Sequence, residues 1–326
     1  MGREETYMDI TAFLTRATVA LLATQRHNWE HGTAMQAFLE AGRMDVVIPM
    51  AREAVYRQLP DGRPAGMEPL DGVVDPCACG EGILRAWQET GDELLEKGLQ
   101  NLKQWVWEKA PRNAQGVLYH LEQSCQFWSD SPYMLPPFLA AVGDIDGALL
   151  HMDAYWQALY DPTAGVMRHI WDDKSGTYPD ASHWGTGSGW TMAGLLRTAS
   201  LLPEGREKDR DRLRQMARTL LNGVLPYRCT DGSFHNVVDD PHSFSEWNLS
   251  QMTAYVIYRG VGEGWLPETY ITEAELMRKG AMAHTDAYGF IFPVCGAPTF
   301  DKPGVSPEAQ AFSFMMATAW QAYENK

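Results

Sequence analysis

The chain has 326 residues, 45% of them hydrophobic, which is enough for one large core or two smaller ones. Its formal net charge is −15, which argues against a nucleic-acid partner because phosphate binding needs clustered Lys and Arg. The same charge disfavours an anionic membrane surface, and no apolar run is long enough for a transmembrane helix.

The five cysteines are too few, and odd in number, for a disulfide framework. Cys77 and Cys79 are separated by one residue, whereas zinc ligand pairs usually have at least two residues between them. The start of the chain lacks the basic and apolar regions of a signal peptide. These features indicate a cytoplasmic protein with reduced thiols.

The hydrophobic pattern predicts a chain of paired helices. In chain order we expect helices at 6–24, from after Gly32 to Ala41, and at 44–56, 83–89, 93–109, 136–143, 145–158, 188–202, 207–223, 246–259, 268–284 and 306–323. Strand signals are short, at 116–120, 165–171 and 289–294. Helix pairs without a large sheet indicate an all-α toroid or solenoid. No low-complexity linker divides the sequence, so we expect one domain over residues 1–326.

The first long loop, His27-Asn28-Trp29-Glu30-His31-Gly32, contains two histidines four residues apart. This spacing fits metal ligands on a helix, but Asn28 and Gly32 do not favour a rigid helix there. The order is also not His-Glu-x-x-His. Histidines that cap helices or lie in the core are the favoured interpretation, and a loop that contacts substrate is the alternative.

Two aspartates, Asp71 and Asp75, lie in the next loop, which is rich in Gly and Pro. Acids in such loops are usually turn or cap residues. A carboxylate pair formed with Asp130, which lies farther along the chain, is the functional alternative.

The most informative stretch is Cys125–Ala140, where Asp130 lies among Phe, Trp, Tyr and Met. Burial among rings raises the pKa of a carboxyl group, and one that keeps its proton near neutral pH can act as a general acid. The competing interpretation is that Asp130 caps the helix that follows, and the two roles can coexist. The 12 tryptophans suit a carbohydrate cleft, because their rings stack on the apolar face of a sugar.

Two later segments carry further polar and aromatic residues, His169-Ile170-Trp171-Asp172 and His183-Trp184-Gly185-Thr186-Gly187-Ser188-Gly189-Trp190. The glycines do not match a dinucleotide fingerprint, and no Rossmann unit surrounds them. Glycines that let the backbone approach a ligand between two tryptophans fit a sugar site, and a tight loop with core tryptophans is the alternative. Farther on, we expect Glu246 and Ser306 to cap helices, with Pro307 in the first turn.

Together these motifs resemble the unsaturated glucuronyl and rhamnogalacturonyl hydrolases of glycoside hydrolase families 88 and 105. The resemblance extends from about residue 29 to residue 320. The matching segments are Trp128-x-Asp130-x-x-Tyr133-Met134-x-x-Pro137-Phe138-Leu139, His169-x-Trp171-Asp172, Glu246 through Gly260, and Gly304-x-Ser306-x-Glu308-Ala309-Gln310. For the family's early aspartate, Asp75 matches the spacing to Gly80 and Thr90 without a gap, so we prefer it to Asp71.

The resemblance implies an (α/α)6 barrel that removes the terminal 4,5-unsaturated uronic acid from polysaccharide-lyase products. It implies that Asp130 is the general acid and base, that Asp75 orients Asp130 or the water, and that no metal or organic cofactor is needed. The resemblance implies that the partner is an oligosaccharide with the unsaturated uronic acid at its non-reducing end, and we expect the chain to be a monomer or homodimer. The residues implied to contact the sugar are His169, Trp190, Trp128, Tyr133, Trp184, Trp29, His31, Thr186 and Ser188.

The chain departs from the family at one position. The family commonly has Arg-Gly-Asn-Gly-Trp where this sequence has Thr186-Gly187-Ser188-Gly189-Trp190, so a positive charge expected near an anionic substrate is missing. The candidates to replace it are Arg168, His183, His31 and Lys302. Two alternatives therefore stay open: another α/α-barrel carbohydrate enzyme, either an inverting glycosidase or a sugar epimerase, and an inactive sugar-binding relative.

Overall fold

The computed structural model describes residues 10–68, 70–296 and 299–326. Its helices form two concentric rings. The inner ring consists of α2 (Asn28–Glu40), α4 (Gly80–Thr90), α6 (Ser131–Met134) with α7 (Pro136–Ala141), α9 (Gly185–Leu201), α11 (Asn248–Gly262) and α13 (Pro307–Glu324). Each of these packs against the next, and α13 packs against α2, so the ring closes.

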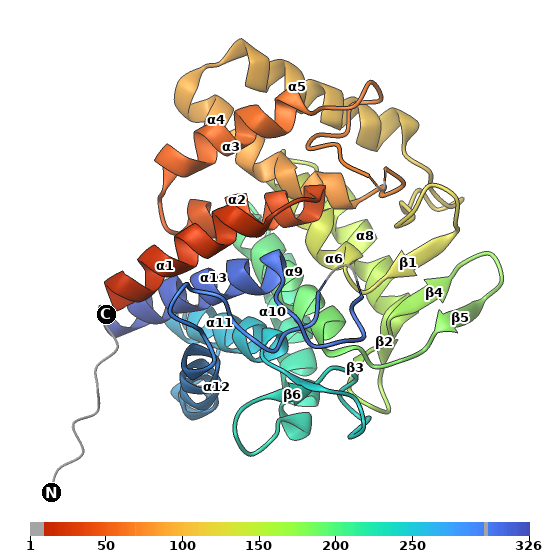
Figure 1. Ribbon diagram of the computed structural model, residues 1–326. Coiled ribbons are helices and arrows are strands. Elements are labelled where there is room, and N and C mark those ends of the chain that lie inside the picture. The colour runs from red at the N-terminus through yellow and green to blue at the C-terminus, as the bar shows by residue number, and fades with distance from the viewer. Residues whose placement is uncertain (1–9, 69, 297–298) are drawn as a thin grey trace, which may run out of the picture.

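The outer ring consists of α1 (Ile10–Thr24), α3 (Met44–Tyr56), α5 (Glu93–Gln104), α8 (Ile145–Leu159), α10 (Glu207–Val224) and α12 (Ile271–Ala283). Every outer helix packs on inner helices, and α1 lies along α13, which brings the first and last helices side by side (Figure 1). The two rings form an (α/α)6 barrel, which confirms the expected fold class.

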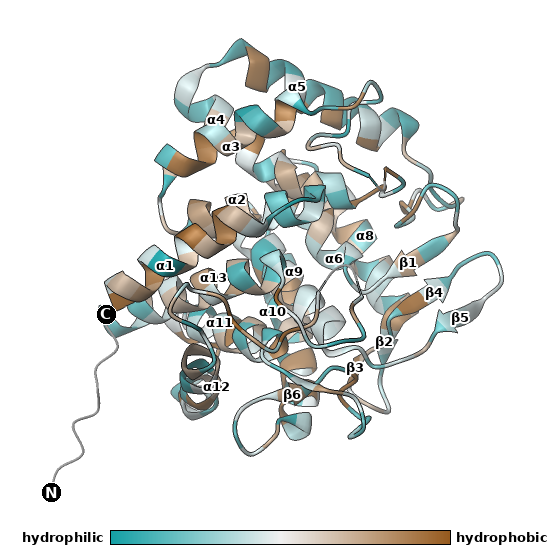
Figure 2. Ribbon diagram, in the orientation of Figure 1, coloured by the Kyte–Doolittle hydropathy of each residue, from teal (hydrophilic) through white to brown (hydrophobic). Residues whose placement is uncertain are grey.

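Hydrophobic periodicity explains which helices lie outside. In α10 the buried residues recur every three or four positions, as expected for a helix with one face on the core: Leu213, Ala217, Leu220, Leu221 and Val224. In α11, by contrast, every residue from Asn248 to Tyr258 is buried. Figure 2 shows hydrophobic and hydrophilic bands alternating along the outer helices α3 and α5.

Short antiparallel strands lie in the loops between helices. Strand β4 (Ile170–Asp172) lies between β1 (Gln126–Trp128) and β5 (Thr177–Asp180) in the largest sheet (Figure 1). The two-stranded pairs are β2 (Tyr160–Asp161) with β3 (Val166–Met167), and β6 (Phe234–His235) with β7 (Ser245–Glu246). The expected segment 165–171 thus splits into two strands, whereas 116–120 and 289–294 form only isolated bridges.

The remaining short helical turns are η1 (Asp75–Cys79), η2 (Trp105–Lys109), η3 (Leu225–Tyr227) and η4 (Glu268–Tyr270). Each predicted helix has a counterpart, and residues 6–9 of the first lie outside the described residues. No helix in the described ranges is long and apolar enough to cross a membrane.

Two segments expected to be loops are helical. Helix α2 begins at Asn28 and α9 at Gly185, so most of the histidine-containing segment and of the glycine-rich segment form first turns of inner helices. Close packing explains the glycines: a Cβ atom at Gly187 would lie 2.1 Å from Ser129 Oγ, and one at Gly32 would lie 2.4 Å from the carbonyl carbon of Ala78. Tertiary packing here overrides the low helix propensity of glycine.

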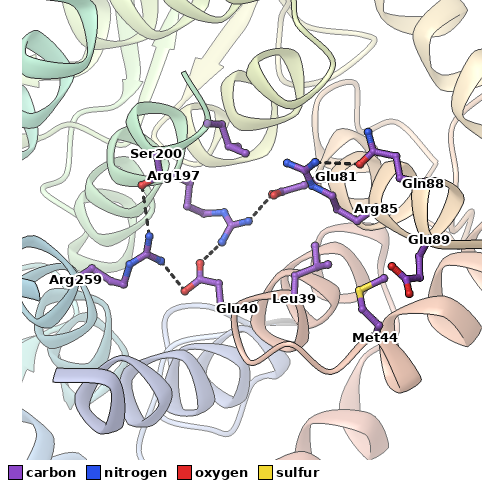
Figure 3. Close-up of a pocket in the computed structure, with 11 residues that line it drawn as sticks. Leu39, Glu40, Met44, Glu81, Arg85, Gln88, Glu89, Arg197, Ser200 and Arg259 are labelled. Atoms are coloured by element: carbon purple, nitrogen blue, oxygen red, sulfur yellow. Dashed lines mark hydrogen bonds and ion pairs between the residues drawn. The ribbon is translucent and has the colours of Figure 1, made fainter. Parts of the chain in front are cut away.

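A buried ion network joins the C-terminal ends of α2, α9 and α11 to α4 (Figure 3). Arg197 pairs with Glu81 at 2.5 Å and also with Glu40. Arg259 donates a hydrogen bond to Glu40 at 2.9 Å. These side chains border a cavity of about 420 Å³ and connect four inner helices across the barrel.

Candidate active site

The opposite ends of α2, α9 and α11 border a larger cavity, of about 540 Å³. First-turn residues of α2, α9, α11 and α13 line it, together with residues of η1, β1 and β5. The predicted site residues that line this cavity are Asp75, Asp130, His169, Trp29, Trp128, Trp184, Trp190 and Thr186. The barrel therefore brings together eight residues that are far apart in the sequence.

Asp130 lies between β1 and α6. It occupies the N-cap position of α6, but its side chain makes no capping hydrogen bond, so the capping interpretation is wrong. One carboxyl oxygen, Oδ2, is buried and has no hydrogen-bond partner among the described residues. Burial raises the pKa of Asp130 to about 6, although nearby His169 acts in the opposite direction. A carboxyl group with this pKa populates both protonation states near neutral pH, as acid–base catalysis requires.

Asp75, at the start of η1, is a second buried carboxyl group in the cavity wall. Burial, reinforced by the negative charges of Asp130 and Asp71, raises the pKa of Asp75 well above its usual range. His120 Nε2 lies 3.6 Å from Asp75 Oδ1, and burial lowers the pKa of His120 to about 3. At neutral pH His120 is therefore uncharged, and burial favours the protonated form of Asp75. Asp71, by contrast, is exposed.

Aromatic and hydrogen-bonding contacts fix the wall beside Asp130. The Trp128 ring stacks on His120 with centroids 4.4 Å apart and meets His169 edge-on at 5.6 Å. His169 Nδ1 lies 2.8 Å from Asp180 Oδ2. The backbone carbonyl oxygen of His169 accepts a hydrogen bond from the Ser129 amide. The pairing of β1 with β4 thus holds Trp128 and His169 on one wall.

A third buried carboxyl group, that of Glu308, lies in the first turn of α13. Its Oε1 accepts a hydrogen bond of 2.9 Å from Trp29 Nε1. Burial, followed by the negative charge of Glu30, raises the pKa of Glu308 to about 7. Ser306 caps this helix by accepting a hydrogen bond from the Ala309 amide, which confirms that prediction.

The prediction for Glu246 is also confirmed, because its carboxylate accepts hydrogen bonds from the first amides of α11, those of Asn248 and Leu249. This contact fixes the N-terminal turn of α11 at the cavity.

Three predicted sugar contacts lie in the core instead of the cavity wall. Tyr133 is fully buried against Trp190. His31 Nε2 is hydrogen-bonded to the carbonyl of Met50 in α3, which agrees with the core interpretation of this histidine. Ser188 Oγ accepts a hydrogen bond from the Met167 amide. In the described part of the chain, none of these three residues lines the cavity.

Trp190 reaches the cavity but is only 2% exposed, because Tyr133 and Phe312 pack against its ring. This ring was expected to stack on the substrate, and the structure instead gives it mainly a packing role. Trp128 is less buried and presents more surface at the wall.

Several cavity residues were missed as sites by sequence reasoning: His120, Asp180, Asn236 and Asn248. His120 is the last residue of the expected strand at 116–120, and only the tertiary fold places it near Asp75. Asn248 is two residues after Glu246, for which the sequence predicted only a helix-capping role and no place at the site. No motif in the sequence marked Asn236 or Asp180.

Among the described residues, no group of three or more His, Cys, Asp or Glu is arranged to hold a metal ion. His27 stacks on Trp29 with ring centroids 4.3 Å apart, while His31 bonds to the α3 backbone. The two histidines that suggested a metal site therefore have separate roles.

A helical barrel with a tryptophan-lined cavity and buried carboxyl groups defines a carbohydrate-processing enzyme of the α/α-barrel class. The model of Glycosyl Hydrolase Family 88 matches residues 8–302, so the chain belongs to this family and is a glycosidase. The chain is 23% identical over 239 residues to the unsaturated rhamnogalacturonyl hydrolase YesR of Bacillus subtilis, an alignment that covers 68% of this chain and 67% of that protein.

Solved structures share the fold at low sequence identity. A possible member of glycoside hydrolase family 105 from Salmonella enterica superposes with a TM-score of 0.85 at 17% identity, covering 99% of this chain and 97% of that one. An unsaturated glucuronyl hydrolase specific for heparin has a TM-score of 0.72 at 12% identity, covering 97% and 98% of the two chains. These structures support the barrel assignment.

Proposed function

We propose that this glycosidase removes a terminal 4,5-unsaturated uronic acid from lyase-derived oligosaccharides by adding water across the C4=C5 double bond. The observation that carries the proposal is the half-buried Asp130 side chain, whose Oδ2 is enclosed by protein and whose pKa is about 6, in a cavity walled by tryptophan rings. The family and the names of its relatives supply the substrate class.

In the proposed reaction, protonated Asp130 gives its proton to C4, and positive charge develops at C5. Water then attacks C5 and returns a proton to the Asp130 carboxylate, so the residue ends in its starting state. The resulting hemiketal opens by breaking the bond between C5 and the ring oxygen. The hemiacetal left at C1 releases the next sugar as an alcohol, and one water molecule is consumed overall.

The neighbours of Asp130 suit this cycle. Asp75, whose pKa burial raises, can share a proton with Asp130 or with the attacking water, and its protonated form adds no second negative charge. His169, held by Asp180, faces the sugar from the β4 side. An inverting glycosidase instead needs an ionised second carboxylate as base. The raised pKa values of Asp75 and Glu308 disfavour that alternative.

Asp75→Asn is expected to lower kcat by about 10²-fold, because the amide cannot share a proton with Asp130 or the water. The matched control is Asp71→Asn, at an exposed aspartate of the same loop and cavity, which should change kcat less than threefold. Initial rates for both variants on the same unsaturated disaccharide make the comparison. A larger loss in Asp71→Asn would assign the second carboxyl role to Asp71.

The rate should fall as the pH rises through the pKa of Asp130. The first step needs the protonated carboxyl group, and its pKa is about 6. Above that value kcat/KM should therefore drop by about tenfold per pH unit. A profile of kcat/KM from pH 4.5 to 8 measures this, and a rate that climbs between pH 6 and 8 would mean that the ionised form starts the reaction.

The proposed function is tested with a panel of lyase-digested polysaccharides: rhamnogalacturonan, glycosaminoglycans, ulvan and gellan. We expect the ultraviolet absorbance of the conjugated double bond to disappear with one of them. A constant absorbance on all of them, with folded enzyme, would contradict the proposal and favour the inactive sugar-binding alternative.

A further inference from the structure

The cavity that would receive an anionic sugar has no Lys or Arg among the described residues of its wall. The candidates for the missing charge are engaged elsewhere. Arg168 and His183 both pair with Asp161, at 2.5 and 3.3 Å. His31 is buried against the α3 backbone, and Lys302 is exposed and not part of the wall. Among the described wall residues, an anion in this cavity therefore meets uncharged donors and the imidazole of His169, but no ammonium or guanidinium group.

Two uncharged side chains in the wall have unused hydrogen-bonding atoms. Asn248 is completely buried, and neither its amide nitrogen nor its amide oxygen has a partner in the described structure. Thr186 is 3% exposed, and its hydroxyl group also has no hydrogen-bond partner in the part of the chain that the structure describes. Buried polar groups are nearly always hydrogen-bonded. Two such groups that border a cavity and have no protein partner therefore indicate that a ligand binds there.

These donors lie on adjacent first turns. Thr186 belongs to α9 and Asn248 to α11, and a Cβ atom at Gly185 would lie only 3.0 Å from the Leu249 side chain. Trp184 and Thr186, at the start of α9, line the cavity, so the positive end of the α9 dipole faces it, and no described side chain caps this helix. The helix end adds partial positive charge where the unpaired hydroxyl lies.

We propose that Thr186 and Asn248 bind the carboxylate of the substrate at the N-terminal turn of α9. Thr186 would donate a hydrogen bond from its hydroxyl group and Asn248 from its amide N–H₂ group, so that these two residues replace the guanidinium group of an arginine. The inference rests on the proposed function, because it presumes a uronate substrate. It makes Thr186 a specificity-determining residue of this chain and not merely the loss of an arginine.

Three acids of the wall oppose this assignment less as the pH falls, because burial raises the pKa of Asp75 well above its usual range and those of Asp130 and Glu308 to about 6 and 7. Of the other acids that line the cavity, Asp180 is paired with His169, and Asp71 and Asp301 are exposed to solvent. Carboxylate binding should therefore weaken as Asp75, Asp130 and Glu308 ionise.

The test compares Thr186→Val and Asn248→Leu with two matched controls, Thr198→Val on α9 and Thr253→Val on α11. The control hydroxyl groups are equally buried and unpaired but do not line the cavity. For each variant we would measure KM for the unsaturated disaccharide and the competitive inhibition constant of its methyl ester, which has lost the negative charge. Thr186→Ser retains the hydroxyl and serves as the conservative variant.

We expect Thr186→Val and Asn248→Leu to raise KM for the acid about tenfold or more, because each removes a hydrogen bond to a charged group. The ester constant should change less than threefold, and both controls and Thr186→Ser should resemble the wild type. Equal increases for acid and ester, or an unchanged KM for the acid, would overturn the carboxylate assignment while leaving the hydrolase intact. Wild-type enzyme that converts no unsaturated substrate would instead overturn the proposed function.

Discussion

Asp130→Asn is expected to lower kcat by about 10³-fold or more, because the amide has no proton to give to C4 and cannot accept one from water. The substitution is nearly isosteric. The Asp130 side chain has no capping hydrogen bond to lose, and burial already disfavours its charge. The thermal midpoint should therefore stay within a few degrees of the wild type, as measured by circular dichroism.

The control for this variant is Asp301→Asn, at an exposed aspartate on the rim of the same cavity. We expect its kcat to remain within about threefold of the wild-type value, because an exposed acid contributes little to proton transfer. Wild-type rates in Asp130→Asn would remove Asp130 from the mechanism. A loss shared equally by both variants would point to the net charge of the cavity instead.

Arg197→Met is expected to cost about 3–5 kcal/mol in the free energy of unfolding, because it leaves buried Glu81 without its cationic partner. The Arg197 side chain is 5% exposed and that of Glu81 is 10% exposed, so water cannot replace the lost contact. Glu40 is affected less, since Arg259 and Tyr255 still donate hydrogen bonds to it. Urea unfolding measures the difference.

Arg212→Met provides the surface comparison. Arg212 pairs with Asp153 where both side chains are largely exposed, so its loss should cost less than about 1 kcal/mol. The double variant Arg197→Met/Glu81→Gln should recover part of the stability, because it removes the unpaired buried charge. If Arg197→Met costs no more than Arg212→Met, the network in Figure 3 does not stabilise the barrel.

The helices were predictable because their hydrophobic periodicity is strong, as α3 shows by matching residues 44–56 without change. The short strands were less predictable, since two or three residues carry little periodic signal. The starts of α2 and α9 were wrong because glycine and asparagine disfavour helices locally, while packing at Gly32 and Gly187 requires a residue without a side chain.

The site, like the fold, was only partly predictable from the sequence. Asp130 and Asp75 were found from motif and spacing, and the barrel brings both to one cavity. Tyr133 lies in the Asp130 motif and Ser188 in the glycine-rich segment, but Tyr133 packs in the core and Ser188 bonds to the backbone. A linear pattern does not distinguish such roles from substrate contact. His120 and Asn248 became visible only when distant segments were assembled around the cavity.

The central claim, that Asp130 catalyses the addition of water to the C4=C5 double bond, is tested most directly by determining whether the product retains this bond. The enzyme would be run in D₂O on an unsaturated disaccharide, and the released uronic-acid product examined by NMR and mass spectrometry. Hydration by Asp130 predicts deuterium at C4 and a product without the C4=C5 bond. A released unsaturated sugar that keeps the double bond and carries no deuterium at C4 would contradict the account and show direct cleavage of the glycosidic bond.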